Sequence, residues 1–226
     1  MNAIILAAGM GTRLRPLTNE IPKCLVSVNG VPMVERQIQF LHEAGINDIT
    51  LVSGYKAEKL DYLKERYGVD IVFNYKYDTC NNIFSMYLVR DRLHDTYVIE
   101  GDVYMDKNCF TTSINKSTYF SVWKDEFVNE WGLSVNENND LTEIVIGNVT
   151  GFIMSGISFW TKEDSKKIVE RLETIIDNNN YTNLFWDNAV IDIHKSLDIH
   201  VIRYDDLHEI DTEKELKSLE SFLNRK

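Results

Sequence analysis

The hydrophobic positions of this 226-residue chain form two kinds of pattern, short apolar runs and stretches with helical spacing. In the first hundred residues the short runs are typical of buried strands, and they cover 1–6, 48–53, 69–74 and 97–100. Apolar residues at intervals of three and four predict helices between these strands, at 33–44, 60–67 and 83–93. The pattern therefore predicts the order β-α-β-α-β-α-β.

The pattern changes after residue 116. Strands are expected at 118–123, 132–135, 141–146 and 157–160, and Asn136–Asp140 is typical of a hairpin turn. The last third predicts helices at 163–177 and 183–194, a strand at 199–203 and a terminal amphipathic helix that uses Leu216, Leu219 and Leu223.

This alternation predicts an α/β fold: a Rossmann-like mixed, mostly parallel sheet flanked by helices, with a small β-rich insertion. No repeat, low-complexity tract or long linker divides the chain, so we expect a single domain over 1–226. In such sheets ligands bind beyond the carboxyl ends of the strands.

Charge and composition narrow the range of partners. The formal net charge is −11, which disfavours broad binding to nucleic acid or to an anionic membrane, since both are polyanions. No apolar window is long enough to span a bilayer and no secretion signal is visible, so a cytoplasmic location is expected. The 3 cysteines and 5 histidines form no zinc or redox motif.

The loop after the first strand carries the most specific chemistry. Gly9 and Gly11 allow backbone N–H groups to approach an anion closely, and Arg13 and Lys23 add positive charge suited to phosphate. The loop is neither a Walker motif, which needs Gly-Lys-Ser/Thr, nor a dinucleotide fingerprint, which would need glycine at Leu14. A polyphosphate cradle is therefore predicted, although a GxG turn alone could be purely structural.

The same segment resembles the nucleotidyltransferase family that activates sugar phosphates and choline phosphate. The residues that carry the resemblance are Leu6, Ala7, Ala8, Gly9, Met10, Gly11, Thr12, Arg13, Leu14, Pro16, Thr18, Pro22, Lys23, Leu25, Val28, Gly30, Pro32 and Glu35. Val34 replaces the usual isoleucine. The resemblance implies nucleotidyl transfer, with 1–115 as the nucleotide-binding part and 116–226 as the acceptor-binding part. It implies that Leu6–Arg13 with Asn81 and Ser85 bind the nucleotide, and that Lys23 and Arg13 are catalytic.

Two aspartates are candidates for metal binding. Asp102 follows the strand at 97–100, at the same sheet edge as the glycine loop, and Asp187 lies among aromatic residues late in the chain. Two carboxylates with phosphate oxygens and water suit Mg²⁺. Asp102 could instead form a turn and Asp187 could cap a helix, but the resemblance implies that both hold Mg²⁺.

Aromatic residues in the second half indicate the acceptor. Trp123 and Trp160 are expected in the core, whereas Trp131, Trp186 and Glu209 could bind a quaternary ammonium group through aromatic faces and a carboxylate. With Asn81-Asn82, Ser85, Ser117–Ser121, Gly156–Trp160 and Glu209-Ile-Asp211, they make the whole chain similar to bacterial choline-phosphate cytidylyltransferases. Phe185 departs from that pattern, which has tyrosine there.

The resemblance implies the reaction CTP + phosphocholine → CDP-choline + pyrophosphate, with Mg²⁺ bound and Lys23 orienting the acceptor phosphate. Phosphoethanolamine and 2-aminoethylphosphonate also fit as acceptors, because a primary ammonium can use the same carboxylate. The glycine loop is also compatible with a sugar-1-phosphate nucleotidyltransferase, although a saccharide pocket would need several hydroxyl-binding polar groups. The fold is compatible with a noncatalytic nucleotide-binding regulator, which the presence of Lys23, Asp102 and Asp187 disfavours. Residue spacing does not exclude uracil or thymine as the base.

Overall fold

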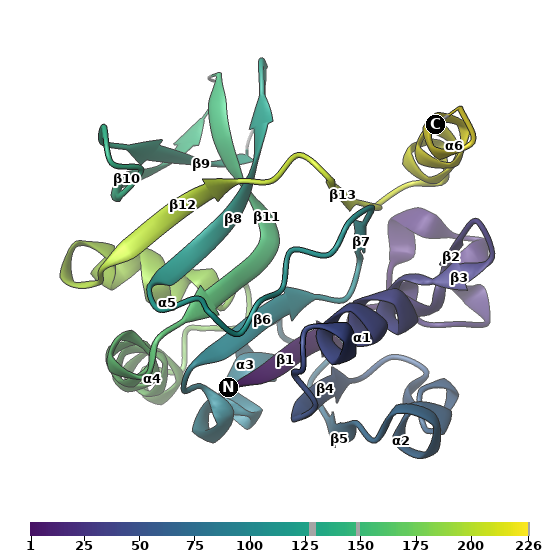
Figure 1. Cartoon of the computed structure of the whole chain (residues 1–226). Coiled ribbons are helices and arrows are strands. Elements are labelled where there is room, and N and C mark those ends of the chain that lie inside the picture. Colours follow the sequence, from purple (N-terminus) through teal and green to yellow (C-terminus); the bar gives the residue numbers. More distant parts are fainter. Residues whose placement is uncertain (127–129, 148–149, 226) are drawn as a thin grey trace.

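A mixed β-sheet runs through the molecule (Figure 1). The structure, a computed structural model, describes residues 1–126, 130–147 and 150–225. In the described chain this sheet has nine strands. They are β1 (Asn2–Ala7), β4 (Ile49–Ser53), β5 (Asp70–Phe73), β6 (Thr96–Glu100), β8 (Ser117–Lys124), β9 (Glu130–Val135), β10 (Leu141–Gly147), β11 (Gly151–Trp160) and β12 (Ile199–Arg203). Their order is β10-β9-β11-β6-β1-β4-β5, and β8 joins β11 to β12.

The central part of the sheet is parallel and the outer part is mixed. β1 pairs in parallel with β4 and β6, and β4 pairs in parallel with β5. β11 runs antiparallel to β6, β8 and β9, and β9 and β10 form an antiparallel hairpin around the predicted turn at 136–140. The predicted α/β class with a β-rich insertion is confirmed.

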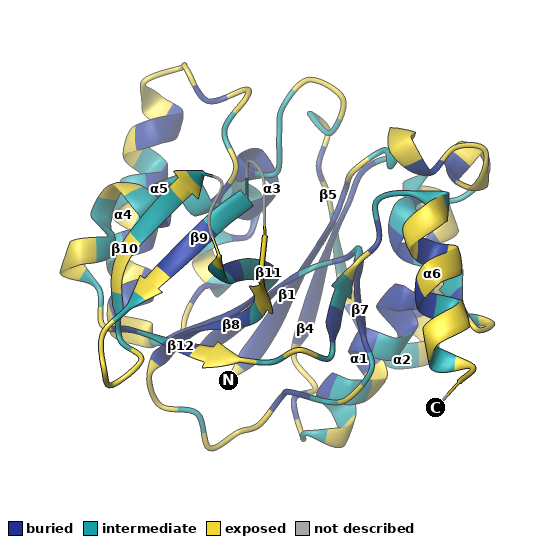
Figure 2. Cartoon of the chain, turned by 90° about the horizontal axis from the view of Figure 1, so that it is seen from above, coloured by how far each residue is buried: buried dark blue, intermediate teal, exposed yellow. Residues whose placement is uncertain are grey.

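Helices cover both faces of the sheet. They are α1 (Met33–Glu43), α2 (Tyr62–Tyr67), α3 (Ile83–Leu88), α4 (Lys162–Asp177) and α5 (Asp187–Ile193). A further helix, α6 (Glu213–Leu223), packs in a separate core with Leu14 and Val28. Neighbouring residues of β1 point to opposite faces, so Ile5 joins the core with Ile38 of α1 while Ile4 joins the core with Leu172 of α4. Seen from above, central strands such as β1 and β4 are buried, whereas β10, β12 and parts of the helices carry exposed residues (Figure 2).

Two short strand pairs lie outside the main sheet. β2 (Ser27–Val28) pairs with β3 (Val31–Pro32), and β7 (Val103–Met105) pairs with β13 (Leu207–Glu209). The sequence did not predict these pairs, because strands of two or three residues show too little hydrophobic alternation. The β7–β13 pair places the segment before α6 next to the carboxyl end of β6.

Several predicted boundaries were wrong. α5 begins at Asp187 rather than 183, because the preceding residues form a turn in which Phe185 N donates to Asn188 Oδ1 at 2.8 Å. α3 ends at Leu88 and β11 begins at Gly151. Trp160 is fully buried as expected, but Trp123, near the end of β8, is 37 % exposed. Within the described chain, no helix has the length and apolar character needed to cross a membrane.

Candidate active site

A cavity of about 570 Å³ opens beyond the carboxyl ends of β1 and β6. Segments from the whole length of the chain form its walls: the glycine loop after β1, the turn before α3, parts of β9 and β11, the start of α5 and the end of β13. Of the predicted site residues the walls contain Leu6, Ala7, Ala8, Gly9, Gly11, Thr12, Arg13, Lys23, Asn81, Ser85, Asp102, Trp131, Trp186, Asp187 and Glu209. Met10 is not among these lining residues.

The loop after β1 folds so that Lys23 lies directly against Gly11. Gly11 has a φ of +57°, and a Cβ there would come within 2.9 Å of Lys23 Cβ. Thr18 Oγ1 donates to Gly11 O at 2.7 Å and holds the loop in this shape. Glycine is thus required at position 11 both by the backbone conformation and by the packing of Lys23.

Lys23 is the cationic centre of the site. Its ammonium donates to Asp102 Oδ2 and, at 2.6 Å, to Asp211 Oδ1. Arg13 approaches the same Asp211 oxygen at 2.9 Å, although its side chain is 69 % exposed. Burial opposes the charge of Lys23, but the charge and hydrogen bonds of Asp102 and Asp211 raise its pKa overall. Lys23 is therefore protonated at neutral pH.

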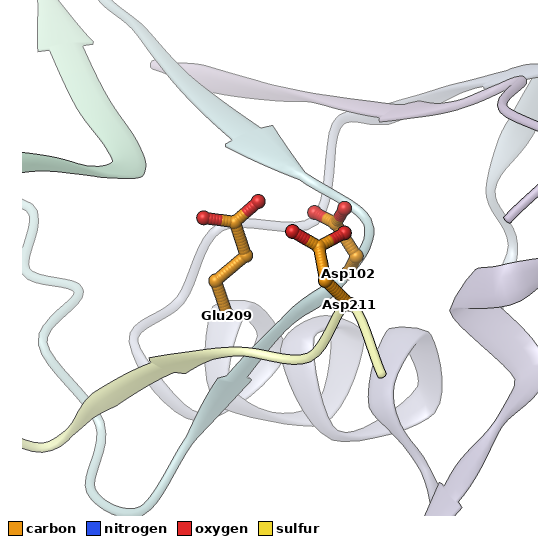
Figure 3. A group of neighbouring side chains, drawn as sticks. All are labelled: Asp102, Glu209 and Asp211. Atoms are coloured by element: carbon orange, nitrogen blue, oxygen red, sulfur yellow. The ribbon is translucent and has the colours of Figure 1, made fainter. Parts of the chain in front are cut away.

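Three carboxylates converge at this point, from Asp102, Glu209 and Asp211 (Figure 3). Asp102 follows β6, and Glu209 pairs with Val103 across the β7–β13 ladder, so the two strands set the distance between the carboxylates. One oxygen from each of the three lies within 4.8 Å of the others. Clustered carboxylate oxygens are suitable ligands for a hard divalent cation.

Crowding changes the acidity of these groups. Burial of its carboxyl end and the negative charge of Asp102 raise the pKa of Glu209 to about 7, although part of the Glu209 side chain is exposed. Burial acts in the same direction on Asp211, but the hydrogen bond and charge of Lys23 lower its pKa overall. Cations thus keep Asp211 ionised, while Glu209 would lose its proton more readily if a cation bound nearby.

Asp187, the second metal ligand predicted from the sequence, lines the same cavity but does not belong to this group of three. It is the first residue of α5, and Tyr119 Oη donates to Asp187 Oδ1 at 3.3 Å. Burial raises the pKa of Asp187 to about 7. Its role in metal binding stays a prediction.

The predicted acceptor residues comprise aromatic side chains on one part of the cavity wall and the carboxylate of Glu209 on another. Trp131 and Phe185 meet edge to face with ring centroids 5.6 Å apart, and Phe185 is 45 % exposed. Trp186 is only 3 % exposed and packs edge to face against Trp160. Glu209 lies among the carboxylates described above. All these residues except Trp160 line the cavity, so an aromatic wall and a carboxylate face a common space.

On the nucleotide side, Asn81 lies in the turn before α3 and Ser85 in the first turn of that helix. Ser85 is buried, and its hydroxyl accepts a hydrogen bond from Asn74 Nδ2 at 2.9 Å. Asn81 Oδ1 accepts from the backbone N–H of Asn82 at 2.8 Å. The hydroxyl and the amide are thus held in place by the protein itself, next to the loop that begins at Leu6.

Sequence reasoning gave no role to Asp211, Glu100 or Asn82, which all line the cavity. The spacing of Glu209 and Asp211 was a usable signal, since residues two apart in an extended segment point to the same side. Glu100 is the last residue of β6, and burial together with nearby carboxylates, Asp102 first among them, raises its pKa well above the usual range. A glutamate in an apolar strand end is unusual enough to be noticed.

Known proteins resemble this chain along nearly its whole length. The family model described as Nucleotidyl transferase matches residues 2–119. The choline-phosphate cytidylyltransferase of Streptococcus pneumoniae is 45% identical over 99% of this chain and 98% of its own, and that of Haemophilus influenzae is 37% identical over 93% and 92%. A 2-aminoethylphosphonate cytidylyltransferase of Lancefieldella rimae is 35% identical over 97% of this chain and 92% of its own.

The chain belongs to the nucleotidyl transferase family. A solved structure of the CTP:phosphocholine cytidylyltransferase of Streptococcus pneumoniae superposes with a TM-score of 0.96, covering 98% of each chain at 45% identity. A glucose-1-phosphate thymidylyltransferase structure from Bacillus anthracis has a TM-score of 0.78 at 19% identity and shares the fold alone.

Proposed function

We propose that this protein is a cytidylyltransferase that converts CTP and phosphocholine to CDP-choline and pyrophosphate. The observation that carries the proposal is the position of Lys23 between Asp102 and Asp211 and against the glycine loop, in a cavity that the aromatic residues also line. The 45% identity to a choline-phosphate cytidylyltransferase along almost the whole chain supports this acceptor.

In the proposed reaction an oxygen of the acceptor phosphate attacks the α-phosphorus of CTP, and the bond to the β-phosphate breaks to release pyrophosphate. The acceptor is already a nucleophile, so catalysis depends on positioning and charge stabilisation rather than on a catalytic histidine. Arg13 and the N–H groups of Gly9–Thr12 would bind the β- and γ-phosphates. Lys23 would orient the acceptor phosphate.

The carboxylates fit a divalent cation, which we propose to be Mg²⁺. We propose Asp102 as one ligand, because it was predicted from the sequence and its carboxylate lies beside those of Asp211 and Glu209. Asp187, the partner predicted from the sequence, lines the same cavity. When bound, Mg²⁺ would stabilise negative charge on the reacting phosphates. Asp211 also orients Arg13 and Lys23 through ion pairs at 2.9 and 2.6 Å.

The aromatic wall supports a choline head group as acceptor. A trimethylammonium group cannot donate hydrogen bonds, so it is bound through aromatic faces and a nearby negative charge. Trp131, Phe185 and Trp186 would supply the faces, and Glu209 the charge. Phe185 stands where the choline-phosphate cytidylyltransferase pattern has tyrosine, so it supplies an aromatic face without a hydroxyl, and phosphoethanolamine and 2-aminoethylphosphonate remain the alternative acceptors. Cytosine as the base, and a cytoplasmic location, stay predictions within this proposal.

A single variant tests whether the site is catalytic. Asp102→Ala should abolish pyrophosphate release with CTP and phosphocholine while CTP still binds in calorimetry without metal. Retained turnover in this variant would contradict the proposed site. Absence of turnover in the wild-type protein with every acceptor would favour a nucleotide-binding regulator.

A further inference from the structure

Asn82 connects three parts of the cavity wall that are distant in the sequence. It precedes α3 and uses both ends of its carboxamide: Nδ2 donates to Glu100 Oε1 at 2.9 Å, and Oδ1 accepts from the backbone N–H of Trp186 at 2.8 Å. Because a backbone N–H can only donate, the orientation of the amide is fixed. Asn82 thus joins the end of β6 to the turn before α5.

A second bond strengthens the same connection. The backbone N–H of Asn81 donates to Thr182 O at 2.8 Å, and Asn81 Oδ1 accepts from Asn82 N at 2.8 Å. The turn before α3 is therefore attached to the segment 181–186 at two points. That segment carries Phe185 and Trp186, which form the aromatic wall, so the attachment sets where this wall stands.

Glu100, the other partner of Asn82, has little room to move. It ends β6, two residues before Asp102, and Gly156 of β11 lies against it. Gly156 has a φ of +79°, and a Cβ at this position would come within 3.1 Å of Glu100 Cβ. Close packing and the strand hold Glu100 in place. Because Asn82 bonds both Glu100 and Trp186, it connects the aromatic wall to the backbone segment that carries Asp102.

We propose that Asn82 is a positioning residue for the acceptor: through Trp186 and Glu100 it fixes the distance between the aromatic wall and the carboxylates around Asp102. The proposal rests on the proposed transfer to a cationic phosphate acceptor. In-line transfer is sensitive to placement, because a displacement of about 1 Å can lower a rate by ~100-fold. The predicted base-binding residues keep hydrogen bonds that the Asn82 side chain does not make: Asn81 Oδ1 accepts from the backbone N–H of Asn82, and the Ser85 hydroxyl accepts from Asn74 Nδ2.

The test compares Michaelis constants for the two substrates. In Asn82→Ala we expect the KM for phosphocholine to rise by about tenfold or more, with the KM for CTP within about twofold of wild type. Asn178→Ala removes an exposed asparagine whose amide bonds Thr174 O at 2.9 Å, and this matched control should leave both constants unchanged. Equal changes in both constants for Asn82→Ala, or no change, would overturn the proposal.

A pair of variants separates the two contacts of Asn82. Asn82→Asp keeps an acceptor for Trp186 N–H but removes the donor to Glu100, so the acceptor KM should rise. The combination N82D/E100Q restores a hydrogen bond with donor and acceptor exchanged and should return most of the lost acceptor affinity. If the double variant is no better than Asn82→Asp alone, the Glu100 contact has no positioning role.

Hydrogen exchange provides a readout that does not require turnover. Loss of the Asn82 acceptor should speed exchange of the Trp186 amide, while amides of β1 keep their protection. Unchanged Trp186 exchange in a folded Asn82→Ala protein would contradict the proposal even if activity fell.

The proposed function and the role of Asn82 can fail separately. If wild-type protein does not use phosphocholine at all, the proposed function fails. If wild-type activity is normal and the KM for phosphocholine in Asn82→Ala is unaltered, only the role of Asn82 is refuted.

Discussion

Lys23 Nζ lies 2.6 Å from Asp211 Oδ1, and the same ammonium donates to Asp102. A lysine from the loop near the N-terminus thus forms ion pairs with two of the three carboxylates that could hold a divalent cation. A cation bound there would compete with the ammonium for the same oxygens. Cation binding would release Lys23 from Asp102 and Asp211 and allow it to contact a phosphate.

The first prediction concerns this competition. Lys23→Met should lower turnover by about 100- to 1,000-fold, as expected when a cation that stabilises developing charge is removed. The same variant should bind Mn²⁺, without nucleotide, on the order of tenfold more tightly, because a competing unit charge is gone. Electron paramagnetic resonance of free Mn²⁺ measures this affinity.

Lys217→Met is the matched control for Lys23→Met. Lys217 pairs with Glu213 at 2.5 Å on an exposed part of α6, so turnover and Mn²⁺ affinity should both stay at the wild-type values. Weaker Mn²⁺ binding in Lys23→Met than in wild type would rule out competition between the ammonium and the metal.

A second prediction identifies the carboxylate that assists Asp102. We expect Asp211→Asn to weaken Mn²⁺ binding by ~10- to 100-fold, the range seen when a group that supports a metal site is lost. Asp187→Asn, measured alongside, tests the pair predicted from the sequence. A larger loss of affinity in Asp187→Asn than in Asp211→Asn would favour Asp187 as the main partner.

A third prediction follows from the raised pKa of Asp187, which burial brings to about 7. In an unfolded chain this pKa is about 3.9, so between these values the folded state binds more protons than the unfolded state. The contribution of Asp187 to stability is therefore full below pH ~4 and is lost as the pH rises to ~7. Urea unfolding of metal-free protein over this range measures it.

Asp187→Asn should flatten that pH dependence, since the amide does not titrate. The variant should be at least as stable as wild type at pH 7, where wild type would have to bury a charged carboxylate. A free energy of unfolding that falls equally steeply in the variant would show that other groups cause the effect.

A fourth prediction concerns the aromatic wall. Trp131→Ala should raise the KM for phosphocholine by ~2- to 30-fold, equivalent to a cation–π contribution of about 0.5–2 kcal/mol. Trp123→Ala is the control, because Trp123 packs edge to face with Phe152 and does not line the cavity. The idea fails if Trp131→Ala affects only the KM for CTP, or if both variants behave alike.

The sequence predicted those features that depend on neighbouring residues. The glycine loop directly follows the apolar run of β1, and Asp102 closely follows the recognisable strand β6. Asp211 was missed as a site residue because its bond to Lys23 joins positions 188 apart, through a strand, β13, of only three residues. The spacing of Glu209 and Asp211 could have shown that both side chains point the same way, but not that Lys23 is the partner. The pairing of β13 with β7 places Glu209 opposite Val103, next to Asp102.

The aromatic residues show the same limit. Trp123 and Trp160 have similar strand settings, yet Trp160 lies under α4 and α5 while Trp123, near the end of β8, is 37 % exposed. Hydrophobicity alone gives each a similar preference for the core. Only the positions of the covering helices separate them. Trp186 likewise combines almost complete burial with a place on the cavity wall.

The most direct test of the account is pyrophosphate release with Mg²⁺, crossing CTP, UTP, dTTP and GTP with phosphocholine, phosphoethanolamine, 2-aminoethylphosphonate and glucose-1-phosphate. The account predicts efficient turnover with CTP and phosphocholine and much weaker turnover with every other pair. Equal or better turnover with a primary amine or a sugar phosphate would contradict the choline site while leaving nucleotidyl transfer intact.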